Sequence, residues 1–338
     1  MKTHITLIVM AALGLGPQIC NAAATDDEAP GDTVDVNGLY YALQGDSVGV
    51  VGYDFTSPSV SGDLVIEPQV EINGHKYDVV YIISNFYRNN TKITSLKCPP
   101  TLKRIGSGAF SGCTNMKSVD LSTGVMYIDK NAFNGCTALT SVSFPASLQT
   151  FGTGCFEQCS SLTSIQFETS DNMLIIPQNC FAGCSSLKYL RVPANVITIQ
   201  DGAFEKTGLE TILFVDSDMP LTIQNSAFVN DNPIQNIYVY RSKVIKLQPN
   251  GFSDNTYQNG TLYIYNKMPA DVQNHYMTDP GWKYFRRNIT TGIEGISADD
   301  SADGVTEYFT LTGQRVSNPR PGIYLMRQGN KVCKTLVR

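Results

Sequence analysis

A repeating pattern of hydrophobic and polar positions occupies the middle of the chain. Aromatic residues recur in it with successive gaps of 23, 23, 23, 25, 23, 24 and 24 residues. The units around them share the template I-x-x-x-A-F-x-x-C-x-x-L-x-x-V-x-L, as in IDKNAFNGCTALTSVSF from Ile128. A spacing of this kind identifies a repeat architecture in which each unit is one supersecondary element. The aromatic positions are Tyr87, Phe110, Phe133, Phe156, Phe181, Phe204, Phe228 and Phe252.

The template predicts how each unit folds. Its final part is a short strand, because apolar residues such as Val142 and Phe144 alternate with polar ones. The part around Ala132 and Phe133 predicts a turn or one to two turns of helix. One coil cannot bury its own apolar side, so successive coils must stack and their strands must pair in parallel. We therefore predict a repeat solenoid, mainly β with short helical turns, that carries a parallel sheet on one face.

The repeat resembles a known family. The core A-F-x-x-C-x-x-L-x-x-V and the upstream segment Ile72–Ile82 are similar to the BspA-like leucine-rich repeats of surface proteins from Gram-negative anaerobes and some mucosal parasites. The resemblance extends over roughly residues 36 to 288. It implies a leucine-rich-repeat solenoid, and it implies attachment or recognition at a cell surface with a ligand that differs between members.

The first residues predict export. Lys2 and His4 precede an apolar run from Ile5 to Leu15, and small residues at Asn21–Ala24 then offer a cleavage site, so residues 1–24 are predicted to be a signal peptide. Lipidation at Cys20 is the less favoured alternative, because the residues just before it are not small. No later segment has the roughly 18 uninterrupted apolar residues of a membrane helix, so we expect no membrane span.

Composition changes on both sides of the repeats. Residues 25–80 lack the template but contain strand-like runs, and we expect them to form a β cap over the first open coil. The repeats are expected to fill residues 81–289, with a second cap near the end in which Trp282 and Phe285 close the core. As the only tryptophan, Trp282 is predicted to be a core residue and not part of a ligand site.

The C-terminal part is predicted to be separate. Residues 290–305 are rich in Gly, Ser and acidic residues, which is typical of a flexible linker. Residues 306–338 contain three strand-like runs, the last two joined as a hairpin around Gly329 and Asn330. Their L-x-G-x-x-V and G-I-Y elements resemble the C-terminal sorting domain of the type IX secretion pathway, which implies delivery to the outer surface. The alternative is a small β domain of unknown use.

Charge and motifs limit the classes of function. With 25 basic and 30 acidic residues, and no basic cluster longer than Arg286 and Arg287, the chain lacks the electrostatic signature of a nucleic-acid-binding protein. His75 and His275 are far apart along a solenoid, so no Ser or Cys nucleophile has a histidine partner. Facing carboxylate pairs and phosphate-binding glycine loops are also missing. We predict a protein that is not an enzyme and that binds no cofactor, metal or nucleic acid.

Eight cysteines follow the predicted signal peptide. Four of them share one template position, and two more replace the alanine before the phenylalanine, so buried free thiols are the favoured interpretation. Disulfides, which are common in exported proteins, and a zinc site built on the Cys-x-x-x-Cys pairs remain alternatives. The eight are Cys98, Cys113, Cys136, Cys155, Cys159, Cys180, Cys184 and Cys333.

The predicted sheet offers a candidate binding face. The position between the last two core residues runs through Lys97, Asp120, Ser143, Gln166, Arg191, Leu213, Tyr238 and Tyr263. We expect these side chains to be exposed, small and polar in the early coils and aromatic in the later ones, where they would suit protein hot spots or sugar faces. The alternative is that cross-strand tyrosines stabilise the sheet or lie under a loop. The candidate ligand-binding residues are Tyr189, Arg191, Leu213, Tyr238, Tyr240, Tyr263 and Tyr265.

Together these features predict an exported protein of the cell surface or the extracellular space. The favoured function is adhesin-like binding of a host or matrix protein through the exposed sheet. A glycan ligand, or an architectural role without a specific ligand, are the alternatives.

Overall fold

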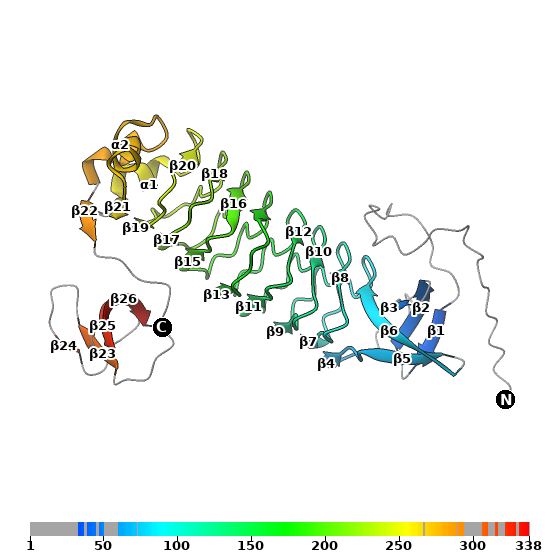
Figure 1. Ribbon diagram of the computed structural model, residues 1–338. Coiled ribbons are helices and arrows are strands. Elements are labelled where there is room, and N and C mark those ends of the chain that lie inside the picture. Colours follow the sequence, from blue (N-terminus) through cyan, green and yellow to red (C-terminus); the bar gives the residue numbers. More distant parts are fainter. Residues whose placement is uncertain are drawn as a thin grey trace, which may run out of the picture.

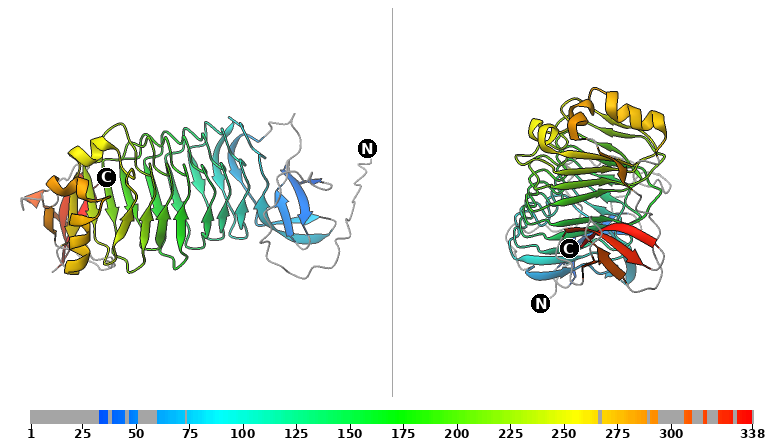
Figure 2. Two further views of the ribbon diagram at one scale, coloured as in Figure 1. Left: turned by 90° about the horizontal axis from the view of Figure 1, so that it is seen from above. Right: turned by 90° about the vertical axis from the view of Figure 1, so that its left-hand side faces the viewer.

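The chain folds into a solenoid whose coils stack along one axis, as the computed structural model shows (Figures 1 and 2). Side chains are described for residues 60–72, 74–265 and 268–285. The structure describes the backbone of residues 33–36, 39–44, 47–50, 60–72, 74–265, 268–288, 290–293, 306–309, 315–316, 322–328 and 331–337. The predicted signal peptide, residues 1–24, lies outside the described residues.

The predicted strands form a parallel ladder along one side of the solenoid, which we call the main ladder (Figure 1, lower side). Registers such as Ser141↔Ser164 and Val142↔Ile165 show that equivalent template positions pair directly. The predicted solenoid with a parallel sheet is therefore confirmed. The strands of the main ladder are β4 (Gly62–Val65), β7 (Ile93–Lys97), β9 (Ser118–Asp120), β11 (Ser141–Phe144), β13 (Ser164–Phe167), β15 (Tyr189–Val192), β17 (Thr211–Phe214), β19 (Asn236–Val239), β21 (Thr261–Tyr265) and β22 (Thr290–Ile293).

A second parallel ladder, which the sequence did not predict, runs along the opposite side of the coils (Figure 1, upper side). It is built from the first apolar position of the template, where Ile105 pairs with Ile128 and Ile128 with Phe151. These strands are two to four residues long, too short for a pattern of alternation. They are β8 (Arg104–Ile105), β10 (Tyr127–Ile128), β12 (Thr150–Phe151), β14 (Leu174–Ile176), β16 (Val196–Ile199), β18 (Leu221–Ile223) and β20 (Ile245–Leu247).

Both ladders are interrupted at the same coil junction. In the main ladder, the sheet that ends at β13 is separate from the sheet that begins at β15. In the second ladder, the break falls between β12 and β14. This junction coincides with the 25-residue gap between Phe156 and Phe181, the longest in the repeat. Backbone hydrogen bonds in the turns still connect the two halves, including Phe156 N to Cys180 O at 2.9 Å.

The repeated aromatic residues form one continuous stack in the core. Neighbouring rings from Tyr87 to Phe252 lie 5.1–5.6 Å apart, with interplanar angles of 4–15°. All eight side chains are buried. Each phenylalanine therefore fills the space between its own coil and the next, as the template predicted.

Two residues before each of the first seven aromatic rings, the backbone adopts the left-handed conformation. Asparagine and glycine alternate here over six coils, from Asn85 to Gly202, and a serine follows in the seventh, with φ from 55° to 64° throughout. Glycine enters this region freely, and asparagine is among the few other residues that do. The alternation has a steric reason, because Asn131 places its Oδ1 only 2.5 Å from where a Cβ on Gly154 would lie.

We expect Gly154→Ala to lower the free energy of unfolding by about 1–3 kcal/mol, because alanine is strained at this φ and its methyl group meets Asn131. Urea unfolding followed by circular dichroism measures the loss. In an Asn131→Gly background the same change should cost less, because the clash with Asn131 is removed and only the backbone strain and the contact with the flexible end of Glu157 remain. An equal loss in both backgrounds would contradict the steric explanation of the alternation.

The N-terminal end of the second ladder is extended by further strands. β1 (Thr33–Val36), β2 (Leu39–Gln44) and β3 (Ser47–Val50) form an antiparallel unit, and β3 then pairs in parallel with β6 (His75–Ile82). β5 (Gln69–Ile72) forms a hairpin with β6, which in turn pairs with β8 of the first coil. The open edge of that coil is thereby covered by β structure.

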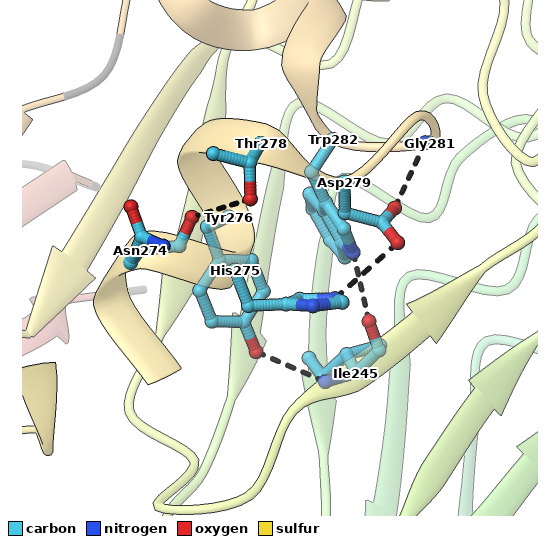
Figure 3. Close-up of polar contacts among 8 residues, drawn as sticks. All are labelled: Ile245, Asn274, His275, Tyr276, Thr278, Asp279, Gly281 and Trp282. Carbon is cyan, nitrogen blue, oxygen red and sulfur yellow. Dashed lines mark hydrogen bonds and ion pairs between the residues drawn. The ribbon is translucent and has the colours of Figure 1, made fainter. Parts of the chain in front are cut away.

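The other end of the solenoid is closed by helices α1 (Asp254–Asn259) and α2 (Ala270–Thr278) and the 3₁₀ helix η1 (Lys283–Asn288). Trp282 is 0% exposed, and its indole Nε1 donates a hydrogen bond to the Ile245 carbonyl at 2.8 Å (Figure 3). The Tyr276 hydroxyl accepts a hydrogen bond from Ile245 N at 3.1 Å. The prediction that Trp282 is a core residue is confirmed.

The C-terminal strands form a separate four-stranded antiparallel sheet. Its order is β24 (Arg315–Val316), β23 (Thr306–Phe309), β25 (Gly322–Gln328) and β26 (Lys331–Val337), and the predicted hairpin between the last two is present. β22 extends the main ladder to Ile293, so the ladder continues into the predicted linker. The rest of that linker lies outside the described residues. Within the described residues, no helix is long and apolar enough to cross a membrane.

Candidate binding surface

The outward side of the main ladder has two different parts. In the early coils the predicted exposed column is confirmed, since Lys97, Asp120, Ser143 and Gln166 are all exposed. In the later coils Arg191 is exposed as well. The first part of the face therefore offers polar and charged side chains on a parallel sheet.

Three of the candidate ligand-binding residues are buried, and the expectation that they would be exposed is wrong. Leu213 is 9% exposed, Tyr238 5% and Tyr240 6%. Strand register explains part of this, because Leu213 pairs with Tyr238, and Tyr238 with Tyr263. Large side chains at equivalent positions of successive strands, about 4.8 Å apart, shield one another from water.

These residues form a second hydrophobic cluster outside the main core, which we call the tyrosine cluster. The Tyr238 and Tyr263 rings stack with centroids 4.6 Å apart and an interplanar angle of 16°. Tyr240 and Tyr265 contact each other at 5.5 Å in a tilted arrangement. The cluster consists of buried Leu213, Tyr238 and Tyr240 with partly buried Tyr189, Val215, Tyr263 and Tyr265 packed against them.

The structure thus brings six of the seven candidate residues together. Arg191 is not a member of the cluster, but it pairs in register with Leu213 and is exposed beside it. Val215 was missed from the sequence. The signal that could have found it is its template position, since it lies two residues after Leu213 just as Tyr240 lies two after Tyr238.

The buried phenols of the cluster, Tyr238 and Tyr240, are uncharged at neutral pH. Burial raises the pKa of the Tyr240 phenol to about 12, with smaller contributions from Tyr189 and Tyr265. Burial likewise raises the pKa of Tyr238 above its ordinary value, and neighbouring Tyr263 adds to the effect. The surface therefore combines a neutral aromatic patch with the exposed guanidinium of Arg191.

Arg241, which follows Tyr240 directly, is a buried residue that sequence reasoning did not identify. Its guanidinium Nη2 donates hydrogen bonds to the Met219 carbonyl at 2.8 Å and the Ala194 carbonyl at 3.4 Å. These carbonyls belong to the two preceding coils, so one side chain ties three successive turns together. Burial lowers the pKa of Arg241. Arg241 therefore helps to position the backbone at the end of β19, where the tyrosine cluster is anchored.

The described cysteines are buried, as their template positions predict. Thiols at the shared template position donate hydrogen bonds to backbone carbonyls of the preceding coil, as Cys136 Sγ does to Phe110 O at 3.2 Å. Burial raises the pKa of Cys113 and of Cys184 to about 12. Among the described residues, no group of three or more His, Cys, Asp or Glu could hold a metal ion. The side chain of Cys333 lies outside the described residues.

The two histidines that follow the predicted signal peptide do not form a common site. His75 is an exposed residue of β6 at one end of the solenoid, and His275 belongs to α2 at the other end (Figure 1). His275 Nε2 lies 3.6 Å from an Asp279 carboxylate oxygen within its own cap (Figure 3). The two side chains therefore lie far apart along the solenoid, as the sequence predicts.

Comparisons with known proteins agree with this architecture. The family described as the BspA type leucine rich repeat region matches residues 80–174 and 165–268, with six copies. No curated protein was found to match the chain.

Several solved structures resemble the chain at low identity. A leucine-rich repeat protein of T. pallidum is 20% identical, with 59% of this chain and 89% of that chain covered and a TM-score of 0.45. One from Bacteroides ovatus ATCC 8483 is 20% identical, with 68% and 70% covered and a TM-score of 0.41. A leucine rich cell surface protein of Faecalibacterium prausnitzii A2-165 is 14% identical, with 81% and 100% covered and a TM-score of 0.37.

Proposed function

This chain belongs to the BspA type leucine-rich repeat family, whose repeats cover more than half of it, and on that premise we propose that it is an exported surface protein that binds a protein partner. Proteins of this family are typically exposed at the cell surface. The signal-peptide pattern of residues 1–24 and the sorting-like pattern of residues 306–338 support the same location. Solenoids of this kind present an extended surface on which a partner can dock.

The observation that carries the proposal is the tyrosine cluster. It is a hydrophobic cluster on the outward side of the main ladder, distinct from the core that holds the coils together except at Tyr265, which packs against both. The equivalent positions of the early coils carry Ser141, Ser143 and other polar residues, so the stacking of coils does not require aromatic side chains there. Its partly buried members, Tyr189, Val215, Tyr263 and Tyr265, leave apolar and aromatic surface on this face, and such surface is the usual mark of an interaction site.

A protein partner suits this surface better than a glycan. Sugar recognition by tyrosine generally uses a free ring face, but the Tyr238 and Tyr263 rings stack on each other. Tyrosine and arginine side chains around a buried aromatic base are instead the composition of protein–protein hot spots. Tyr189, Tyr263 and Tyr265 are the partly buried members, and Arg191 is the exposed cation beside them. We therefore assign partner contact to these four residues and a supporting role to Leu213, Tyr238 and Tyr240.

The test is binding of the purified chain to immobilised matrix proteins and mucins, with a glycan array run in parallel. We expect Arg191→Ala to weaken attachment roughly tenfold or more, as for a hot-spot residue. Lys97→Ala is the matched control, because Lys97 is an exposed cation at the same template position far from the cluster. Equal attachment of the two variants would remove the cluster from the binding site.

The alternative functions give different results in the same experiments. Retention on the glycan array without any bound protein would replace the protein partner with a glycan. Ordered self-association of the chain, with no attachment to either surface, would indicate an architectural role. Either result would overturn the proposed protein-binding function.

A further inference from the structure

Two cysteine sulfur atoms meet inside the solenoid. Cys155 Sγ lies 3.3 Å from Cys180 Sγ, and both side chains are fully buried. Among the described cysteines, Cys155 and Cys180 are the two whose side chains hydrogen-bond to each other. The four cysteines at the shared template position instead hydrogen-bond to backbone carbonyls: Cys113, Cys136, Cys159 and Cys184.

Both cysteines stand where the repeat otherwise places alanine. Alanine precedes the stacked phenylalanine in the coils on either side of the pair. Cysteine replaces it in two consecutive coils, so the two thiols are direct neighbours in the column. The column from Phe110 to Phe228 reads Ala109, Ala132, Cys155, Cys180, Ala203 and Ala227.

The backbone around the pair suits a cross-link. Phe156 N, next to Cys155, donates to Cys180 O at 2.9 Å, so the two chain segments are hydrogen-bonded neighbours. Such neighbours lie about 4.8 Å apart. That spacing falls within the roughly 4.4–6.8 Å between the Cα atoms of disulfide partners. Formation of the bond at about 2.05 Å requires the sulfur atoms to approach by on the order of 1 Å.

The pair lies where a cross-link would stabilise the contact between two coils. Cys155 precedes, and Cys180 follows, the junction at which both ladders are interrupted. Here neither β12 and β14 nor β13 and β15 pair, and the connecting segment carries Met173, which is 62% exposed. These two coils therefore lack the ladder pairing that joins their neighbours, and hydrogen bonds in the turns, such as Phe156 N to Cys180 O, connect them instead. A covalent bond at this junction would compensate for the missing strand pairing.

We propose that Cys155 and Cys180 form a disulfide that joins the two halves of the solenoid across the interrupted junction. This inference rests on the proposed export of the chain, because disulfides persist in oxidising compartments. The coil between the two residues, with a sequence separation of 25, is closed into a covalent loop.

The reaction is thiol–disulfide exchange with a disulfide oxidant such as glutathione disulfide or an oxidoreductase. One cysteine thiolate attacks the oxidant and releases its first thiol, which leaves a mixed disulfide. The second cysteine thiolate then attacks the cysteine sulfur of that intermediate and releases the other thiol. The two cysteines lose two protons and two electrons, and the oxidant gains them. Because both thiols are fully buried in the folded solenoid, the exchange takes place before these coils close.

The experiment begins with the full chain unfolded under reduction and refolded in a buffer of glutathione and glutathione disulfide. Free thiols are then alkylated in denaturant, and the protein is cleaved after glutamate and after phenylalanine. Cleavage after Glu157 and Glu168 separates Cys155 from Cys159 and Cys180, and cleavage after Phe181 separates Cys180 from Cys184. Mass spectrometry should find the Cys155 and Cys180 peptides joined and two hydrogens lighter than the two thiol peptides.

Two variants separate the cross-link from other effects. The double variant Cys155→Ala/Cys180→Ala carries the residue that neighbouring coils have in this column, so it should fold. Wild type refolded with oxidant should unfold at a midpoint roughly 5–10 °C higher than wild type refolded with reductant only. The double variant should show no such difference, whereas the control Cys136→Ala should retain it.

The outcomes distinguish this proposal from the export on which it rests. Alkylation of both Cys155 and Cys180 after oxidative refolding, or a bond from either to Cys159 or Cys184, would overturn the inferred pair. The same analysis is made on chain taken from the producing cells. A bond found after refolding but absent from that material would overturn the export premise, and with it the cross-link in the cell.

Discussion

Replacing Phe133 with alanine is expected to lower the free energy of unfolding by about 3–5 kcal/mol. Phe133 is 0% exposed, and its ring stacks on Phe110 at 5.4 Å and on Phe156 at 5.1 Å. Truncation therefore opens a cavity between the Phe110 and Phe156 rings. Equilibrium unfolding in urea, followed by circular dichroism, measures the loss.

Two further variants control for this result. Phe133→Leu retains apolar volume at the site and should cost less than the alanine variant. Met173→Ala removes a side chain that is 62% exposed, so it should change the stability by no more than about 0.5 kcal/mol. If Phe133→Ala were as mild as Met173→Ala, the aromatic stack would not be the main source of adhesion between coils.

Trp282→Ala should destabilise the C-terminal end of the solenoid by about 3–5 kcal/mol. The substitution removes the largest fully buried side chain and its ring contacts with Phe252 and Tyr276. It also leaves the Ile245 carbonyl without the indole donor that it has now. The measurement is the unfolding midpoint in urea, compared with that of the wild type.

Trp282→Phe separates the contribution of ring packing from that of the indole hydrogen bond. It retains an aromatic ring but not the indole N–H, and the loss of that buried hydrogen bond should cost about 1–3 kcal/mol. Because stability in a solenoid depends on neighbouring coils, the last repeats should lose hydrogen-exchange protection before the first ones in Trp282→Ala. Uniform loss along the whole chain would contradict the assignment of Trp282 to a local cap.

The tyrosine cluster shows where reasoning from the template stops being reliable. The template correctly places Lys97, Asp120 and Ser143 in an exposed column. The same column becomes buried at Leu213 and Tyr238, although these two residues still pair in register as the template predicts. Exposure at one position depends on the size of the side chains in the adjacent coils. A template that describes each position by itself does not include this dependence.

The sequence by itself determined the repeat, the aromatic stack, the main ladder and the burial of the cysteine column. It could do so because the buried aromatic position recurs from coil to coil, from Phe110 to Phe252, so the same preference for burial is visible many times along the chain. Only the tertiary structure decided the second ladder, the break at the 25-residue coil, the contact between Cys155 and Cys180 and the burial of Tyr238. These features arise between coils, from distances and neighbours that no single repeat encodes.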